Sequence, residues 1–205
     1  TRHRIEEGVD KGITSKQGLI AEGRGEAFDY LLGEQTIESA DAAERAAAAQ
    51  LLLADHPVLS VNGNVAALVA AEMVDLAEAV DADIEINLFN RTEERMEAIA
   101  DHLREHGAES IKGLTADGRI PNLSHERAKV DADGIGAADV VLVPLEDGDR
   151  AEALGAMGKT EIVIDLNPLS RSAQVAAIPI VDNIMRAVPN MTAHARDLRS
   201  VDRET

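Results

Sequence analysis

Short runs of apolar, often β-branched residues recur from residue 57 onward, and polar residues follow each run closely. The runs cover residues 57–61, 84–89, 138–143, 161–164 and 178–181. Runs of this length are typical of strands that are buried on both faces of a parallel sheet. We therefore expect an α/β domain of three layers, with a mostly parallel, Rossmann-like sheet whose strands end in polar turns.

Helical patterns fill much of the remaining chain. After the first strand, residues 65–80 predict a helix, and after the second strand a helix runs through Arg104. Residues 193–199 predict a short amphipathic closing helix. Residues 110–136 carry few regular signals and predict a surface loop, in which the adjacent His125 and Glu126 have weak spacing for a metal site.

The first 53 residues predict helices and no strands. Residues 5–12 are typical of a helix that Gly12 stops, and Ser15 is a suitable cap for the next helix. We expect Gly23-Arg24-Gly25-Glu26 to interrupt that second helix. These glycines either let the backbone approach a ligand at which Arg24 points, or form a simple helix-to-helix turn. A further helix is expected over residues 37–53.

The length of 205 residues fits a single domain. We divide it into an N-terminal helical part, residues 1–53, and a Rossmann-like part, residues 54–205. The chain has no cysteine, which excludes disulfides and thiolate zinc sites. No apolar run is long enough for a membrane span and no signal peptide is visible, so we expect a cytoplasmic protein without a membrane partner.

The charge balance is strongly acidic. Lys and Arg number 20 against 38 Asp and Glu, which gives a net charge of −18. Such a charge opposes non-specific binding to nucleic acid. The acids are scattered over expected helix surfaces, and lysine is scarce, a composition that resembles proteins adapted to high salt. We interpret the net charge as a sign of habitat rather than of function.

The strongest candidate for chemistry is the stretch E-I-V-I-D-L-N-P-L-S-R-S, residues 161–172. Pro168 cannot continue a strand, so the polar residues after residue 164 should lie beyond the strand's carboxyl end, where open α/β sheets bind ligands. Asp165 and Asn167 could contact a ribose or a base, and Arg171 with two serines suits a phosphate. The alternative is a capped strand-to-helix turn in which Asp165 and Ser170 only satisfy backbone donors.

Other strand ends are less specific. Asn62-Gly63-Asn64 either offers helix amides to an anion or forms an ordinary turn. Asn90-Arg91-Thr92 is a rival signal, since an arginine at this place can meet the 2′-phosphate of NADP, but the G-x-G-x-x-G fingerprint is absent from the preceding turn. Glu146 and Asp147 could bind Mg²⁺ through water or an ammonium group, or could simply be solvated.

Beyond these patterns, long strings of the sequence resemble one family. They are G-L-I-A-E-G-R-G-E-A-F-D-Y-L-L-G-E, S-V-N-G-N-V-A-A-L, I-N-L-F-N-R-T-E-E-R, V-P-L-E-D-G-D-R-A-E-A-L and I-D-L-N-P-L-S-R-S-A. The chain is similar, over nearly its whole length, to archaeal phosphopantothenate synthetase, the 4-phosphopantoate–β-alanine ligase.

The resemblance implies an ATP-dependent ligase of coenzyme A biosynthesis. Such an enzyme condenses 4-phosphopantoate with β-alanine and yields 4-phosphopantothenate, AMP and diphosphate by way of an acyl-adenylate, with Mg²⁺ expected beside ATP. It also implies a homodimer, for which the alanine-rich segment 40–49 would be a suitable interface, although packing within one chain is the commoner use of such a segment.

The resemblance also implies site residues. The expected ATP contacts are Arg2, Arg24, Asp165, Leu166, Asn167, Arg171, Ser172, Asn183 and Ile184. Charge and position suggest for the acid substrate Lys16, Asn62, Asn64, Arg91 and Arg127, with Glu146 and Asp147 for Mg²⁺ or the β-alanine ammonium group.

The sequence is also compatible with two alternative functions. One is an NADP-linked oxidoreductase, which rests on Asn90-Arg91-Thr92 and is weakened by the missing glycine motif. The other is a nucleotide-binding regulatory module without catalysis.

Overall fold

The centre of the protein is a parallel sheet of five strands, seen in a computed structural model that describes residues 1–200. The strands are β1 (Pro57–Val61), β2 (Asp83–Ile86), β5 (Val140–Leu142), β6 (Thr160–Ile164) and β7 (Ile178–Ile180). Every neighbouring pair in the order β2-β1-β5-β6-β7 is parallel. The five expected strands and the α/β class are thus confirmed.

The strand order determines where a ligand site should lie. Counted in chain order, the five strands of this sheet lie in the spatial order 2-1-3-4-5, a common doubly wound arrangement. The chain reverses direction across the sheet between β1 and β5. Open α/β sheets bind ligands outside the carboxyl ends of the strands at this switch point.

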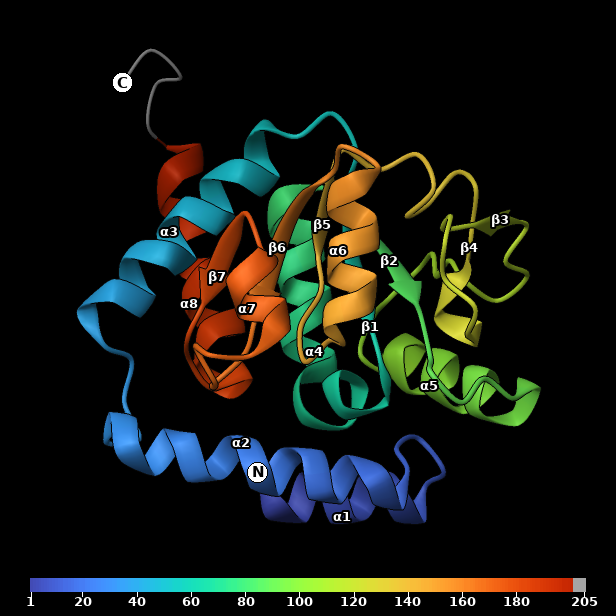
Figure 1. Ribbon diagram of the computed structural model, residues 1–205, viewed down its shortest axis with the longest axis horizontal. Helices are drawn as coiled ribbons and strands as arrows, with labels where there is room; N and C mark the ends of the chain where they lie inside the picture. Colours follow the sequence, from blue (N-terminus) through green and yellow to red (C-terminus); the bar gives the residue numbers. More distant parts are fainter. Residues whose placement is uncertain (201–205) are drawn as a thin grey trace.

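Helices cover both faces of the sheet (Figure 1). One face packs against α3 (Glu38–Leu53), α4 (Gly63–Val80), α5 (Glu93–Glu105) and α8 (Ile184–Arg199). The other packs against α6 (Gly148–Ala156), α7 (Arg171–Val175) and part of residues 110–136. Along β1, Leu59 and Val61 face the first layer and Val58 faces the second, as the alternation of a strand requires.

The expectation of a surface loop over residues 110–136 is wrong. This segment contains a short antiparallel hairpin, β3 (Gly118–Arg119) and β4 (Lys129–Val130), and a 3₁₀ turn, η1 (Glu126–Ala128). Ile120 and Ile135 are wholly buried in the second core cluster. The buried Glu85 of β2 accepts hydrogen bonds from the amides of Asp131 (3.0 Å) and Ile135 (2.6 Å), which ties the segment to the sheet.

Two helices at the start of the chain lie across the carboxyl edge of the sheet (Figure 1). They are α1 (Arg2–Asp10) and α2 (Lys16–Leu32), and α2 continues through Gly23 and Gly25, so the expected interruption is wrong. The body of the protein holds both ends of α2. Gly18 lies so close to α4 that an added Cβ would be 2.3 Å from Asn64 Oδ1, and Asp29 bonds with Arg186 and Asn183.

Two helices were wholly or partly missed. α6 occupies residues after β5 where the sequence suggested only a polar turn, and α8 begins at Ile184 rather than near Ala193, passing through Pro189. Ala40, Ala47 and Ala48 of α3 are buried within this chain, and α3 packs along α8. The alanine-rich face is therefore used for packing within the chain. Among residues 1–200, no helix combines the length and the apolar character needed to cross a membrane.

Candidate active site

A continuous cleft lies between α2 and the carboxyl ends of the strands. It consists of two adjoining cavities of about 330 Å³ and about 390 Å³, each of a size that accommodates a small-molecule ligand. The two cavities share part of their lining, namely Ala21, Arg24, Asn64, Leu145 and Asp147. We call them the arginine half and the β6 half. Because the halves share a wall, ligands bound in each would lie next to one another.

The β6 half contains most of the residues expected to bind ATP. Its lining includes Arg24, Asp165, Leu166, Asn167, Arg171, Ser172, Asn183 and Ile184. These residues come from α2 and from the segments after β6 and β7. The carboxyl edge of the sheet thus brings together residues that are far apart in sequence.

Local hydrogen bonds shape the turn after β6. Asp165 Oδ1 accepts from the amide of Asn167 at 2.9 Å, and Asn167 Oδ1 accepts from the amide of Leu169 at 3.0 Å. Ser170 caps α7 by accepting from the amide of Ala173 at 3.1 Å. The capped-turn interpretation is therefore correct for these contacts. It is compatible with ligand binding, since both Asp165 and Asn167 also line the cavity.

Arg171 lies at the edge of the β6 half with its charge already paired. Its guanidinium donates to Glu152 (2.7 and 2.6 Å) and pairs with Asp149, both on α6. These contacts raise the pKa of Arg171, and its side chain is largely exposed. A phosphate in the cleft would have to compete with two carboxylates for this side chain.

Three guanidinium groups line the arginine half: those of Arg24, Arg95 and Arg127. The polar run Glu93-Glu94-Arg95 by itself predicts a solvated helix start, but Arg95 lies in the lining of the cleft. Its guanidinium donates to the carbonyl of Asn90 at 2.6 Å, and burial lowers its pKa. The signal that could have identified Arg95 is its position in the first turn of the helix after β2, at the carboxyl edge.

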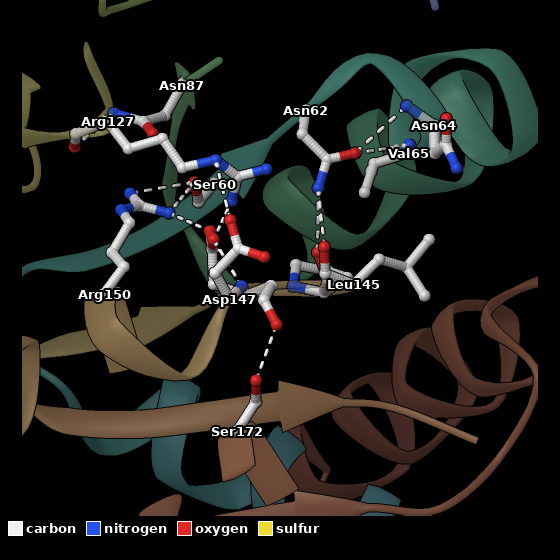
Figure 2. Close-up of polar contacts among 12 residues, drawn as sticks. Ser60, Asn62, Asn64, Val65, Asn87, Arg127, Leu145, Asp147, Arg150 and Ser172 are labelled. Atoms are coloured by element: carbon white, nitrogen blue, oxygen red, sulfur yellow. Dashed lines mark hydrogen bonds and ion pairs between the residues drawn. The ribbon is translucent and has the colours of Figure 1, made fainter. Parts of the chain in front are cut away.

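The segment 144–147 forms the wall between the halves and is held from several sides (Figure 2). Asn62 donates to the carbonyls of Pro144 (3.0 Å) and Leu145 (3.3 Å), and its Oδ1 accepts from the first amides of α4. From the opposite side, Ser172 donates to the carbonyl of Glu146 at 2.6 Å. The polar atoms of Asn62 are thus used to join the ends of β1 and β5.

Not all expected substrate residues lie in the cleft. Asn64 lines both halves, but it also bonds with Thr14 and donates to the carbonyl of Gly18 at 3.1 Å. Lys16 is exposed at the start of α2 and lines neither half. Arg91 also lies outside, where it donates to the carbonyls of Gly113 and of Leu114 (2.8 Å).

Arg2, an expected ATP contact, lies outside the cleft of this chain as well. Its guanidinium donates to Glu26 at 3.0 Å and to the hydroxyl of Tyr30 at 2.8 Å, both on α2. The structure therefore brings together eight of the nine expected ATP residues and leaves Arg2 on the outside.

Helix N-termini and buried arginines make parts of the cleft attractive to anions. The N-termini of α4, α6 and α8 meet there, since Gly63, Gly148 and Ile184 line it, and helix N-termini carry partial positive charge. Burial lowers the pKa of Arg127 to about 10, so this guanidinium still carries its charge at neutral pH. Carboxylates also line the β6 half, so it is the arginine half, with three arginines against Asp147 alone, that differs in sign from the acidic surface around it.

The cluster of potential metal ligands in the described chain lies away from the cleft. One cluster of potential ligands, Asp41, Glu44 and His194, lies on α3 and α8 and lines neither half. Within the cleft, Asp147 has a half-exposed carboxylate on the shared wall. It is the side chain best placed to meet a cation bound between two ligands.

Comparisons with known proteins agree with this geometry. The family model described as phosphopantothenate/pantothenate synthetase matches residues 39–205. Among similar proteins, one from Thermococcus kodakarensis is 61% identical over 99% of this chain and 78% of its own length. One from Methanosarcina mazei is 55% identical over 99% of this chain and 80% of its own length. One from Methanospirillum hungatei is 54% identical over 97% of this chain and 81% of its own length. All three carry the name 4-phosphopantoate–β-alanine ligase.

Proposed function

The chain belongs to the phosphopantothenate/pantothenate synthetase family, and on that premise we propose that it joins 4-phosphopantoate to β-alanine at the expense of ATP. The products are 4-phosphopantothenate, AMP and diphosphate. The observation that best supports this proposal is the cleft itself, in which a half lined by three arginines adjoins a half suited to a nucleotide.

The acid substrate fits the arginine half by charge. 4-Phosphopantoate carries a phosphate and a carboxylate, and guanidinium groups bind such oxygens through paired, charge-assisted hydrogen bonds. Arg95 and Arg127 lie in this half, and Arg24 lies on the shared wall. We assign Arg127 to the acid substrate and Arg24 to the groups that react.

The nucleotide fits the β6 half. Asp165 and Asn167 follow the strand end, where their oxygens can accept from a ribose or a base. The N-terminus of α8, at Asn183 and Ile184, and the side chains of Arg24 and Arg171 suit the phosphates. Arg171 would exchange its bonds to Asp149 and Glu152 for the nucleotide.

The proposed reaction has two steps. A carboxylate oxygen of 4-phosphopantoate bonds to the α-phosphorus of ATP, and diphosphate leaves with the electrons of the broken P–O bond. The amine of β-alanine then attacks the acyl carbon, AMP leaves, and the amine loses a proton. Since the first step joins two anions, Arg24 at the shared wall lowers its barrier by neutralising charge. The walls of the cleft position the reactants and limit the access of water to the adenylate.

Magnesium would supply further neutralisation of the ATP phosphates when it is bound. The exposed carboxylate of Asp147 fits this role because Mg²⁺ prefers oxygen ligands and usually keeps several waters. The same carboxylate could instead bind the ammonium group of β-alanine. Both roles place Asp147 beside the reacting groups.

An assay for AMP tests the proposal. With ATP, Mg²⁺, 4-phosphopantoate and β-alanine in molar salt, we expect AMP to form in proportion to 4-phosphopantothenate and only when both acid and amine are present. ATP binding without AMP would support a regulatory module instead. The NADP-linked alternative loses its basis, since Arg91 is bonded to backbone carbonyls outside the cleft.

The proposal includes a homodimer, as the resemblance implies. Its interface would differ from the buried alanine face of α3, which α8 of the same chain already covers. Light scattering in molar salt should give the mass of two chains, and the mass of one chain would contradict the dimer.

A further inference from the structure

The carboxylate of Glu146 is buried behind the wall of the cleft and is bound by two arginines. One of its oxygens pairs with Arg127, which lines the arginine half, and the other pairs with Arg150 of α6. The side chain of Glu146 is only 2% exposed and that of Arg150 is fully buried. Neither carboxylate oxygen of Glu146 is therefore accessible to a Mg²⁺ ion or to an ammonium group.

Arg150 touches no part of the cleft, yet it is firmly fixed. It approaches the hydroxyl of Ser60 on β1 with two nitrogens, at 3.2 and 3.3 Å (Figure 2). The same guanidinium pairs with Glu146, four residues earlier in the chain. Arg150 thus links the start of α6 to the strand beside the switch point.

The charges explain why a second arginine is useful here. If Arg127 alone faced Glu146, the two charges would cancel, and the cleft would lose a cation that binds anions. With Arg150 also present, two guanidinium groups share the buried carboxylate of Glu146, and the other carboxylate paired with Arg127, that of Asp147, is more than half exposed. Burial raises the pKa values of the nearby carboxyl groups of Glu85 and Glu161, to about 7 and about 8, so at neutral pH they carry less negative charge than exposed glutamates would.

The geometry limits the orientations of Arg127 as well. Its guanidinium is held by Glu146 on one side, and its Nε lies 3.8 Å from Asp147. Its own backbone carbonyl accepts from Asn87 at 3.2 Å. A guanidinium that is held in this way needs little reorganisation when an anion binds.

We propose that Arg150 is a positioning residue for the acid substrate: through Glu146 it fixes the guanidinium of Arg127 and preserves its net charge for the phosphate or carboxylate of 4-phosphopantoate. This inference rests on the proposed function, because it takes the arginine half to be the site of the acid. It gives Glu146 and Asp147, which are adjacent in sequence, different tasks. Glu146 supports the wall, and only Asp147 is free for ligands.

The test compares Arg150→Met with Arg150→Lys in steady-state kinetics. We expect Arg150→Met to raise the KM for 4-phosphopantoate about tenfold, equivalent to about 1.4 kcal/mol. The KM for ATP and the kcat at saturating acid should change less than about twofold, since an interaction that acts on binding alone affects KM. Arg150→Lys keeps the charge and should restore much of the affinity. Arg104→Met, which removes an exposed arginine of α5, serves as a control and should change neither KM.

A double-mutant cycle separates positioning from general damage. If Arg150 acts through Arg127, the variant carrying both Arg127→Met and Arg150→Met should have the same KM for the acid as Arg127→Met alone. Fully additive effects, or an equal rise in the KM for ATP, would overturn the proposal. So would a variant that is only less stable, with both KM values unchanged.

If Arg150→Met fails to fold, a milder change takes its place in the test. Ser60→Ala removes the hydroxyl that Arg150 contacts and leaves every charge in place. We expect it to raise the KM for the acid about two- to threefold, and an unchanged KM would count against the positioning role. Failure of the proposed function is a distinct result, because the unmodified protein would then form no acid-dependent AMP.

Discussion

Glu161 lies on β6 with its carboxyl group enclosed on the face of the sheet that α6 covers, and it is only 2% exposed. Among the described residues, none donates a hydrogen bond to its Oε1. Burial raises the pKa of Glu161 to about 8, although the nearby Arg150 acts in the opposite direction. Glu161→Gln keeps the shape of this side chain and removes its ionisation.

The sign of the effect follows from proton binding. A glutamate in the unfolded chain has a pKa near its ordinary value of 4.5, so between pH 4.5 and about 8 the folded chain holds a proton that the unfolded chain has lost. This contribution to stability is complete below pH 4.5, and it is lost as the pH rises through 8. Glutamine has no proton to lose, so the variant avoids this decline.

The same two pKa values set an upper limit on the difference in unfolding free energy between Glu161→Gln and the unmodified protein. The difference between about 8 and 4.5 corresponds, at about 1.4 kcal/mol per pKa unit, to at most about 5 kcal/mol. Relaxation and water entry reduce the cost of a buried charge in real proteins. We expect Glu161→Gln to be more stable than the unmodified protein by about 1–3 kcal/mol at pH 9, and by much less at pH 5.5.

Urea unfolding in molar salt at pH 5.5, 7 and 9 measures this difference. Glu109→Gln, which neutralises an exposed glutamate, serves as a control and should show no comparable trend with pH. A stability difference between Glu161→Gln and the unmodified protein that stays constant from pH 5.5 to 9 would refute the reasoning. So would a variant that is less stable at pH 9, because the carboxylate would then be stabilised by Arg150.

Two further predictions concern the cleft. Asp29→Asn weakens the bonds that hold α2 to Arg186 (2.6 Å) and Asn183 (2.8 Å), so we expect faster amide hydrogen exchange in the last turns of α2 and a higher KM for ATP. Asp41→Asn on α3 should change neither quantity. Asn62→Ala leaves two carbonyls and two amides without their side-chain partner, so urea unfolding should show a loss of about 1–3 kcal/mol. An unchanged unfolding free energy would mean that water replaces the Asn62 contacts.

The sheet was predictable because its strands are buried on both faces. The runs at 57–61 and 161–164 are confirmed to the residue or within one residue, since continuous apolar runs between polar turns leave few alternatives. The segment 110–136 was missed for the opposite reason. Its few buried residues are separated by polar ones, and it is held in place by Glu85, a buried acid that no pattern of apolar residues indicates.

Helices were predictable where their apolar spacing was regular. The start of α6 was missed because its first residues are polar. The charge of Arg150 suggests an exposed side chain, but Arg150 is buried in an ion pair with Glu146. α2 was expected to break at its glycines, which favour other conformations. Contacts at both of its ends keep it helical, and such tertiary contacts are invisible in a local pattern.

The candidate site likewise contains residues that the sequence could place in the cleft and residues that it could not. Residues 165–172 could be assigned to the cleft because they follow a buried parallel strand. A polar turn at that point lies at the carboxyl edge of an open sheet, where ligands bind. Lys16 and Arg91 were chosen for their charge, but charge does not give direction: one is exposed on α2 and the other bonds to backbone carbonyls. Arg95 belongs to a helix start whose polar residues predict a solvated surface, although its position in the first helical turn places it in the cleft.

The contrast between surface and cleft bears on how an acidic protein can bind anions. A net charge of −18 repels a phosphorylated acid and ATP at long range. In about 1 M salt the Debye length falls to about 3 Å, so exposed carboxylates scarcely act on a ligand that approaches the cleft. Partly buried groups are screened much less, and Arg127 is one of them. High salt therefore weakens the repulsion between the surface carboxylates and an anionic ligand more than it weakens the attraction between that ligand and the arginine half. An acidic surface and an anion-binding cleft can thus coexist in one molecule.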